Sequence, residues 1–547
     1  MDAGVSWPLT SDDGGVPAVR TTATATACLA AATRAAGGDV GRLEKERAWR
    51  ENYARHFVDH VTACATSAEA ATRAARAGLD FVYDCFTFTR PGAAASAAPA
   101  LLREAMEDPM PRAFATAVLD GGGARADAPA PSLSMPYNGK VLNGASLVAQ
   151  ADAWARQGVI EPSAAAAVRA ASVLGASGRL ATALAGHVFA VMGAGAEMGP
   201  TATLLSLGAT IVAVDLDGRP FMWQRLLGLA RASRGRLVVP VRRRDGDGDA
   251  EQLELPDEEL CERAGANLLT DTPEVAAWLS SVCPGQAMTV GAYAYLDGAA
   301  FVRISVAQDA IATAVLRRRP GTSLSYLCTP TDIFLRPLAA RRAALQRYEE
   351  RPAWMRFLAT SSCSRLMSRN AVLDEPLTNG DGVEVDVVDC TVSQQGPNYL
   401  FAKRIQHWRA VVARAGGAVV SSNIAPSSAT VSVTKAKLLK AAFDGVRYVP
   451  PIEVFQPATA NAAMAIALLH DIFDADSAAH PTTPLSHPLL LFADGAWHGG
   501  MWRCGVKVGS AAVPAAVIGL AIEHSSSLMG GGALATVGVG LLLRSRL

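Results

Sequence analysis

A tyrosine and a lysine lie four residues apart in the segment CTVSQQGPNYLFAKRIQHW. This spacing would place Tyr399 and Lys403 on one face of a helix. Only seven lysines occur in the 547 residues, so few tyrosines have a lysine at this offset. A neighbouring ammonium lowers the pKa of a phenol, which can then pass a proton to or from a carbonyl oxygen near neutral pH. The pair therefore predicts acid-base chemistry on a hydroxyl or carbonyl substrate.

A glycine-rich turn follows a buried apolar run in the segment HVFAVMGAGAEMGPTATLLSLGATIVAVDLDG. The pattern predicts a strand at 188–192, then the turn, a helix and a second strand that ends at Asp215. We expect Gly193 to permit the tight turn and Gly195 to let the backbone approach a pyrophosphate. We expect Gly199 to let the helix pack closely on the strand, and the N-terminus of the helix to offer N–H groups to the phosphates.

Asp215 would accept hydrogen bonds from the adenosine ribose, which favours NAD over NADP. The same order of elements suits S-adenosylmethionine, whose ribose is also held by a carboxylate at the end of the second strand. A third interpretation is an Ala/Gly-rich piece of core that binds nothing.

These two segments make the region 186–505 resemble a divergent short-chain dehydrogenase/reductase. In that family the glycine turn reads GxxxGxG; Gly193 and Gly199 match its first and last glycines, and Glu197 stands at the middle position. The YxxxK motif of the family matches the tyrosine–lysine pair. The resemblance implies an NAD- or NADP-dependent oxidoreductase that acts on a small hydroxyl or carbonyl substrate, which would be lipid-like if the apolar C-terminal tail meets a membrane.

The resemblance also implies a hydroxyl group that polarises the substrate carbonyl, from the loop after the preceding strand. Thr391 or Ser393 would supply it here, because Asp386 stands where the family usually has its serine. The Asn-rich motif after the fourth strand of the family is not recognisable, and Tyr399 lies further from the glycine turn than is usual. The alternative is a non-catalytic scaffold that keeps the sheet and the nucleotide.

Short apolar runs alternate with helical segments from residue 186 onward. Strands separated by helices require crossover connections, and therefore a parallel sheet with helices on both faces. The predicted fold class is α/β: a Rossmann-like doubly wound parallel sheet with a mostly α-helical N-terminal domain and an apolar C-terminal tail. The predicted strands are 188–192, 211–214, 237–239, 287–291, 323–328, 383–388 and 418–422, and the charged segment 242–252 is predicted to be a solvent loop.

Three regions follow from this pattern: a helical domain at 1–180, the dehydrogenase-like domain at 186–505 and the tail at 506–547. Residues 42–79 have apolar side chains at helical spacing and predict one long amphipathic helix. Further helices are expected at 101–106 and 145–155, with a turn at 135–144.

The composition narrows the class of protein and its partners. Fifty basic and fifty acidic residues cancel, which argues against nucleic acid as a partner. The nine cysteines are scattered without a CxxC pair, which indicates a reduced intracellular protein without a structural metal. His56 and His60 would share a helix face, but the glutamate of an HExxH motif is missing, so we interpret them as half-buried helix residues and predict no metal site.

The C-terminal tail is the most apolar part of the sequence. Its uncharged run 528–543 is shorter than the roughly 20 residues that span a bilayer. It therefore predicts either membrane contact or a surface for homo-oligomerisation. The last three residues, 545–547, read Ser-Arg-Leu and resemble the S-K-L peroxisomal address. A peroxisomal location is expected, with membrane association as the alternative.

Overall fold

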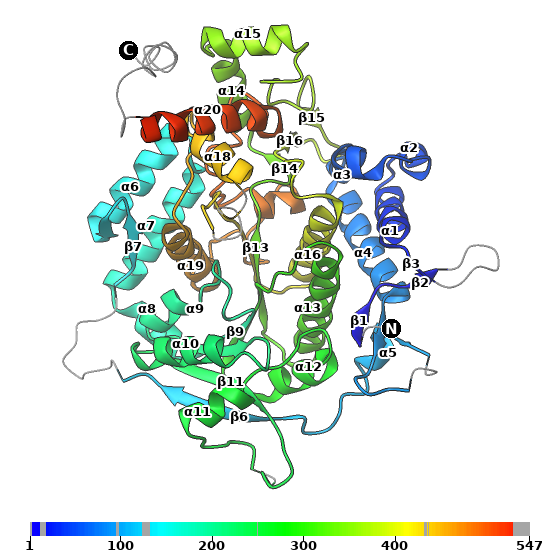
Figure 1. Cartoon of the computed structure of the whole chain (residues 1–547), viewed down its shortest axis with the longest axis vertical. Coiled ribbons are helices and arrows are strands. Elements are labelled where there is room, and N and C mark those ends of the chain that lie inside the picture. The colour runs from blue at the N-terminus through cyan, green and yellow to red at the C-terminus, as the bar shows by residue number, and fades with distance from the viewer. Residues whose placement is uncertain are drawn as a thin grey trace.

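The apolar runs form a seven-stranded sheet in the order β17-β13-β12-β9-β10-β11-β6 (Figure 1). All neighbouring strands are parallel except β6 (Phe114–Asp120), which pairs antiparallel with β11 at one edge. The computed structural model describes residues 3–10, 18–94, 98–122, 132–248, 250–430, 435 and 437–528. The parallel strands are β9 (His187–Met192), β10 (Thr210–Val214), β11 (Arg236–Arg242), β12 (Ala287–Ala292), β13 (Ser323–Cys328) and β17 (Val420–Ile424).

The parallel strands are added to the sheet in chain order, starting from β9 at its centre. The chain passes to β10 and β11 on one side, then returns to the other side of β9 and adds β12, β13 and β17. The direction of winding therefore reverses between β9 and β12. Six of the seven predicted strands belong to this sheet. The seventh, predicted at 383–388, is a strand but lies in another sheet. It forms β16 (Glu384–Asp389), which pairs antiparallel with β14 (Ile333–Arg336) and β15 (Leu377–Thr378).

Successive residues of the central strand enter two different cores. Val188, Ala190 and Met192 pack on one face of the sheet, whereas Phe189 and Val191 pack on the other. Because both faces are covered, the strand is a continuous apolar run rather than an alternating one. The first face carries α12 (Thr272–Ser281), α13 (Ala299–Arg318) and α16 (Pro397–Ala415), and the second carries α9 (Thr201–Ser206), α10 (Pro220–Arg231) and α19 (Pro457–Phe473).

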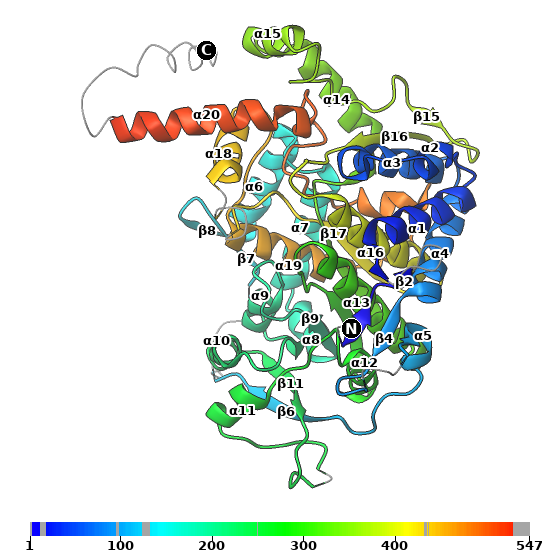
Figure 2. The ribbon, with the colours of Figure 1, turned by 45° about the vertical axis from the view of Figure 1, so that its right-hand side comes forward.

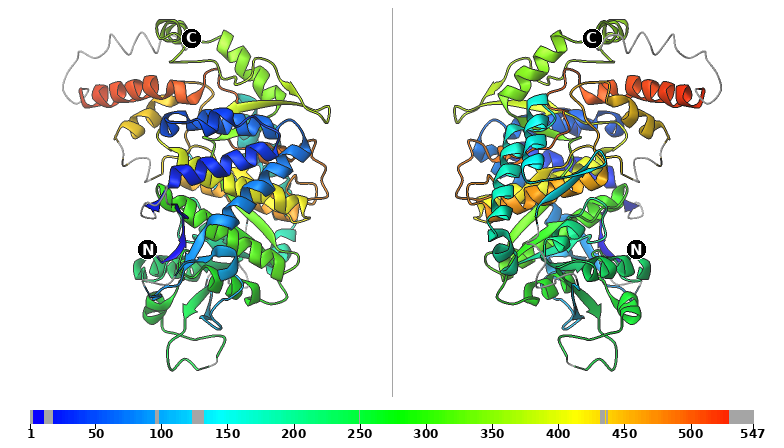
Figure 3. Two further views of the ribbon diagram at one scale, coloured as in Figure 1. Left: turned by 90° about the vertical axis from the view of Figure 1, so that its right-hand side faces the viewer. Right: turned by 90° about the vertical axis from the view of Figure 1, so that its left-hand side faces the viewer.

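The N-terminal helices form outer layers on this sheet rather than a separate domain. α1 (Thr21–Ala35), α3 (Trp49–Cys64) and α4 (Ala68–Cys85) cover α16, while α6 (Gly144–Gln157) and α7 (Pro162–Ala176) lie on the opposite side (Figures 2 and 3). One continuous core joins side chains from both sides of the predicted boundary at 180–186, and β6 comes from the N-terminal part. The helices before the predicted boundary therefore bury their apolar faces on the sheet's own helices.

The long helix predicted at 42–79 is broken into three. α2 (Gly41–Glu44) precedes α3, and Ser67 begins α4 by accepting a hydrogen bond from the Ala70 amide at 3.0 Å. A serine in this position stabilises a helix start. The apolar spacing continued across the break, so periodicity alone did not reveal it.

The two further helices are confirmed, whereas the predicted turn at 135–144 is a β-hairpin whose turn is limited to residues 138–139. The helices expected at 101–106 and 145–155 are α5 (Leu102–Ala105) and α6, and the turn joins β7 (Ser134–Tyr137) to β8 (Lys140–Asn143). The other described elements are β1 (Gly4–Ser6), β2 (Leu9–Thr10), β3 (Ala18–Val19), β4 (Thr87–Thr89), β5 (Ala100–Leu101), α8 (Arg179–Ala185), α11 (Asp257–Arg263), α14 (Leu338–Glu349), α15 (Ala353–Ser361), α18 (Lys437–Val446), η1 (Pro488–Phe492) and α20 (Val508–Leu528).

Residues 529–547 lie outside the described part of the chain, and so do nearly all of the apolar run 528–543 and the terminal Ser-Arg-Leu. Within the described residues, α13 alone is long and apolar enough to cross a membrane. It packs between α12 and α16 with most of its side chains buried, as a core helix does.

Candidate functional site

The carboxyl ends of the parallel strands meet at one edge of the sheet. In open α/β sheets, the crevice for a ligand lies at this edge where the winding reverses. In this chain that place is between β9 and β12. The glycine turn leaves β9 there, and the loop 293–298 leaves β12.

Gly193 makes the tight turn that its position predicted. Its φ is +92°, in the region that favours glycine, and its amide donates to the Val214 carbonyl at 2.8 Å. A Cβ atom on this residue would lie 2.5 Å from the backbone nitrogen of Ala294. The turn therefore packs backbone to backbone against the loop after β12.

Gly195 ties the turn to the end of the second strand. Its amide donates to Asp215 Oδ2 at 2.7 Å, and the Leu216 amide donates to Oδ1 at 2.8 Å. A Cβ atom on Gly195 would lie 3.0 Å from Met222 Sδ, so its side-chain position faces the protein. Arg225 donates to the Gly195 carbonyl at 2.8 Å and adds a positive charge beside the turn.

Gly199 has a different role from the expected one. The atoms nearest to a Cβ built on it belong to the turn itself, at 3.2 Å from the Ala196 carbonyl, so it does not serve helix–strand packing. The helix that follows, α9, has only six residues. Asn461 of α19 donates to the Gly199 carbonyl and accepts from Thr203 Oγ1 at 2.8 Å. Side chains therefore hold the turn at both of its ends: Arg225 contacts Gly195, and Asn461 contacts Gly199.

Tyr399 lies in the first turn of α16, next to the same loop that contacts Gly193. Its ring centroid is 6.1 Å from that of Tyr295 and 5.2 Å from that of Phe301. Tyr295 directly follows Ala294, the residue packed against Gly193. The fold thus brings the glycine turn and the tyrosine, which are far apart in sequence, to the two sides of one loop.

Lys403 points toward β13. Its ammonium donates to the Leu327 carbonyl at 2.8 Å and to Gln406 Oε1 at 3.2 Å. It lies 5.9 Å from the Tyr399 ring centroid and 5.5 Å from that of Phe301, within the range of cation–π attraction. Burial lowers the pKa of Lys403, which its acidic neighbours only partly offset.

The expected lowering of the Tyr399 pKa is wrong. Burial raises the pKa of Tyr399 to about 12, and the negative charge of Asp332 acts in the same direction. A hydrogen bond from Thr329 opposes this rise because it favours the phenolate. Desolvation dominates, since the ammonium of Lys403 is directed to a carbonyl of β13 rather than to the phenol oxygen.

Thr391 and Ser393 do not reach the phenol in this structure. Thr391 Oγ1 donates to Asp389 Oδ1 at 2.6 Å, and Ser393 is exposed. Both follow β16, which belongs to the small antiparallel sheet. The role of these two hydroxyls stays a prediction, and the strand that precedes α16 in the main sheet is β13 and not β16.

Thr329 is the hydroxyl that sequence reasoning missed. It directly follows β13, acts on Tyr399 in the direction that lowers the pKa of the phenol, and lies 2.9 Å from Thr331 Oγ1. The signal was available, because the strand at 323–328 was predicted and Thr329 is the next residue. Residues 329–396 form an insertion between β13 and α16 that contains β14 to β16.

Asp386 serves structure rather than catalysis. It is fully buried in β16; Arg336 Nε donates to its Oδ2, and Arg341 Nη1 donates to its Oδ1 at 2.6 Å. Both arginines are buried as well. The triad holds the insertion together.

The two predicted helix histidines are buried more fully than expected, and both are paired. His60 shares a hydrogen bond of 3.0 Å with Thr33 through Nδ1, and Trp408 Nε1 donates to His60 Nε2 at 3.2 Å. His56 Nε2 lies 2.7 Å from Glu46 Oε2. Burial lowers the pKa of His60 to about 3, so it is neutral at physiological pH. Within the described residues, no group of three or more His, Cys, Asp or Glu is placed to hold a metal ion.

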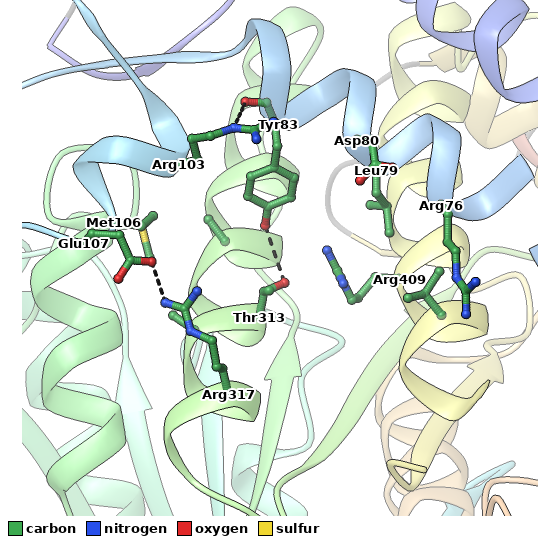
Figure 4. A pocket seen from close by; sticks show the side chains of 13 residues that line it. Arg76, Leu79, Asp80, Tyr83, Arg103, Met106, Glu107, Thr313, Arg317 and Arg409 are labelled. Atoms are coloured by element: carbon green, nitrogen blue, oxygen red, sulfur yellow. Dashed lines mark hydrogen bonds and ion pairs between the residues drawn. The ribbon is translucent and has the colours of Figure 1, made fainter. Parts of the chain in front are cut away.

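A cavity of about 440 Å³ lies between α4, α13 and α16, where Tyr83, Thr313 and Arg409 line it (Figure 4). Arg409 is ten residues beyond Tyr399, or about 15 Å along the helix axis by the rise per residue. Arg409 is also held by Asp309, at 2.7 and 2.9 Å. This cavity is therefore separate from the edge that carries the glycine turn.

No family model, curated protein or solved structure matches the chain.

Proposed function

We propose that the chain is an NAD(P)-dependent oxidoreductase with a Rossmann-like nucleotide site at the β9/β12 edge. The observation that carries the proposal is that one loop, 293–298, contacts both Gly193 and Tyr399. A dinucleotide that crosses this edge would have its diphosphate at the turn and its redox ring toward the tyrosine. The strand order supports this, because the dinucleotide-binding order 3-2-1-4-5-6 is obtained when β9 is counted as the first strand.

The residues at the turn fit a nucleotide of this kind. Gly193 leaves no side chain at the point where the winding reverses, and Arg225 brings positive charge beside the turn. Asp215 accepts a hydrogen bond from the Gly195 amide of the turn and would also accept from ribose hydroxyls. Its negative charge would repel the 2′-phosphate of NADP, so NAD is the favoured cofactor.

At the other end of the site, Tyr399, Thr329 and Lys403 would handle the proton. A bound reduced nicotinamide supplies a hydride to the carbonyl carbon of the substrate. Tyr399 would donate its proton to the carbonyl oxygen, and Thr329 would orient and stabilise the phenol oxygen through their hydrogen bond. Lys403, held by the Leu327 carbonyl, would keep a positive charge near the developing negative charge.

Carbonyl reduction requires the protonated form of Tyr399, whereas alcohol oxidation requires the phenolate. With a pKa of about 12, the phenol is protonated at neutral pH and is ready to act as an acid. Oxidation of an alcohol would need the phenolate, which is scarce at that pH. We therefore propose carbonyl reduction as the direction that the site performs at neutral pH.

Nucleotide binding by the purified full chain tests the proposal. Saturating NADH should raise the melting temperature, since a ligand at 100 times its Kd adds about 2.7 kcal/mol. Tyr399→Phe should keep the NADH-induced shift and lose turnover. A chain whose melting temperature responds to neither NADH nor NADPH contradicts the proposal.

Two other functions would give different outcomes in the same assay. An S-adenosylmethionine-dependent transferase, whose ribose would meet Asp215 in the same way, would be stabilised by that ligand and not by NADH. A non-catalytic scaffold would respond to none of these ligands, or would bind NADH with no difference in turnover between Tyr399→Phe and the parent chain.

A further inference from the structure

The helix α20 leaves the body of the protein as an apolar rod (Figures 2 and 3). It contains no charged residue from Val508 to Ile522. Val513 and Val517, one turn apart on its outer face, are 62% and 61% exposed. Exposed apolar residues that gather on one face of a helix indicate a surface made for a partner.

The helix beside α20 is basic. Lys435, Lys437 and Lys440 are exposed, and these are three of the seven lysines in the whole chain. Arg447 follows the end of α18, and Asp444, the only acidic residue between 435 and 447, pairs with Lys440 at 2.7 Å and lies 3.9 Å from Arg447. The apolar rod therefore lies next to a concentration of positive charge.

The basic helix α18 packs closely against α20. A Cβ atom on Gly445 would lie 1.8 Å from the Ala515 carbonyl oxygen, and one on Gly519 would lie 1.9 Å from the Ala441 carbonyl oxygen. The two helices therefore cross at or below the usual 8–10 Å between axes.

A third helix extends the same end of the molecule. Phe357 of α15 is 70% exposed, and Arg356 and Arg365 beside it are also exposed. The segment after α15 is tied to the start of α20, since the Met367 amide donates to the Ser510 carbonyl at 3.3 Å. Figures 1 and 2 show α15 and α20 at the same end of the protein.

We propose that α15, α18 and α20 form a docking surface for an anionic phospholipid bilayer. Val513, Val517 and Phe357 enter the interface, while Lys435, just before α18, and Lys437, at its first position, meet the lipid phosphates. Anionic lipid is the chemistry that matches both the apolar face and the basic residues beside it. The sequence beyond α20 agrees, because residues 529–543 carry no charge and the basic residues Arg544 and Arg546 follow them.

The docking surface is connected to the proposed site but does not depend on its chemistry. Lys507, which directly precedes α20, forms an ion pair with Asp389 at the end of β16. In the segment that follows β16, Gln395 donates to Thr331, which is hydrogen-bonded to Thr329. A docked protein would therefore hold the edge of the sheet near the membrane. Substrates dissolved in the bilayer would reach such a site most readily.

Flotation of the full chain with vesicles tests the proposal. The chain should float with vesicles of phosphatidylcholine containing 30% phosphatidylserine, and bind more weakly to phosphatidylcholine alone. Val513→Glu with Val517→Glu should lower vesicle affinity by tenfold or more. The matched control is Val141→Glu with Val173→Glu, which changes two valines of equal exposure, 65% and 64%, outside this surface, and should bind as the parent does.

The charges are tested in the same way. Lys435→Gln with Lys437→Gln should lower affinity for the anionic vesicles about 25-fold at low salt, at roughly fivefold per lysine. Lys45→Gln with Lys140→Gln, both exposed elsewhere, should have no such effect. Unchanged flotation of the Val513→Glu, Val517→Glu variant would overturn the proposal and assign binding to residues 529–547. A parent chain that forms dimers, dissociates through these valine changes and does not float would make the surface a contact between copies.

Discussion

Gly193 and Ala294 are packed so closely that a single methyl group would not fit between them: a Cβ atom on Gly193 would lie 2.5 Å from the Ala294 nitrogen. This contact joins the turn after β9 to the loop after β12, where the sheet reverses its winding. Through Tyr295, the same loop reaches Tyr399. The proposed nucleotide site depends on this contact.

Gly193→Ala should abolish the NADH-induced rise in melting temperature. The control is Gly417→Ala, because Gly417 has the same φ, +93° against +92°, but no atom near its Cβ position. Both variants carry the backbone strain of a left-handed residue, about 1–2 kcal/mol. Only Gly193→Ala also pushes the two loops apart. Equal NADH responses in the two variants would contradict the nucleotide site.

Thr329→Val should lower the rate of carbonyl reduction by 10²-fold or more, since acid-base groups contribute about that much. The reason is the loss of the hydrogen bond that favours the phenolate of Tyr399. Ser393→Ala should leave the rate unchanged, because Ser393 is exposed after β16. Steady-state kinetics of both variants decides between the two hydroxyls; a large effect at Ser393 with none at Thr329 would reverse the assignment.

The pH dependence of the rate should report a protonated phenol. Because burial raises the pKa of Tyr399 to about 12, the rate of reduction should not fall between pH 7 and pH 10 through loss of this proton. Oxidation of the corresponding alcohol should rise with pH over the same range, since it needs the phenolate. A reduction rate that falls with an apparent pKa near 7 would show that the bound site lowers the pKa after all.

Stability should fall in acid because of buried neutral histidines. Burial lowers the pKa of His60 to about 3 and that of His187 to about 4, below the ordinary 6.5 of the unfolded chain. The unfolded state therefore binds more protons below pH 6.5, and stability is lost as pH falls from 6.5 toward these values. Each histidine should cost about 2 kcal/mol between pH 7 and pH 5.

Urea unfolding at the two pH values measures this loss. In His60→Gln the difference between pH 7 and pH 5 should be smaller than in the parent by about 2 kcal/mol, whatever the variant costs at pH 7. The comparison with the parent removes the contribution of every other titrating group. An unchanged difference would mean that His60 is not buried in its neutral form.

The buried triad of Asp386 should be essential to stability. Asp386→Asn removes the charge that compensates Arg336 and Arg341, and should destabilise the fold by about 3–5 kcal/mol. The control is Asp374→Asn, which breaks an exposed pair with Arg369 and should have no measurable effect on urea unfolding. Similar effects of the two substitutions would mean that the triad is solvated.

Local sequence patterns determined most of the main sheet. The uninterrupted apolar runs at 188–192 and 211–214 become β9 and β10, because strands covered on both faces have no polar positions. The glycine turn could also be predicted from the sequence, because the positive φ at Gly193 favours glycine at that single position.

Contacts between segments that are distant in the sequence could not be predicted from local patterns. The run at 383–388 has the composition of a core strand, yet it pairs with β14 and β15 because the insertion that contains it forms its own small sheet. As a result, Thr391 and Ser393 were assigned a role for which Thr329 is better placed. Nor could local patterns show that β6 pairs with β11 of the main sheet, or that α4 packs on α16, both of which come later in the chain.

The sequence by itself therefore determined which residues form the strands and which tyrosine and lysine share a helix face, because these depend on neighbours within a few positions. Only the tertiary structure decided that Tyr399 and Gly193 border one loop and that Thr329 is the partner of the phenol. It also decided that burial raises the Tyr399 pKa and that the Lys403 ammonium donates to the Leu327 carbonyl. A pKa depends on how much water and which charges surround the group, and those neighbours come from segments that meet only when the sheet assembles.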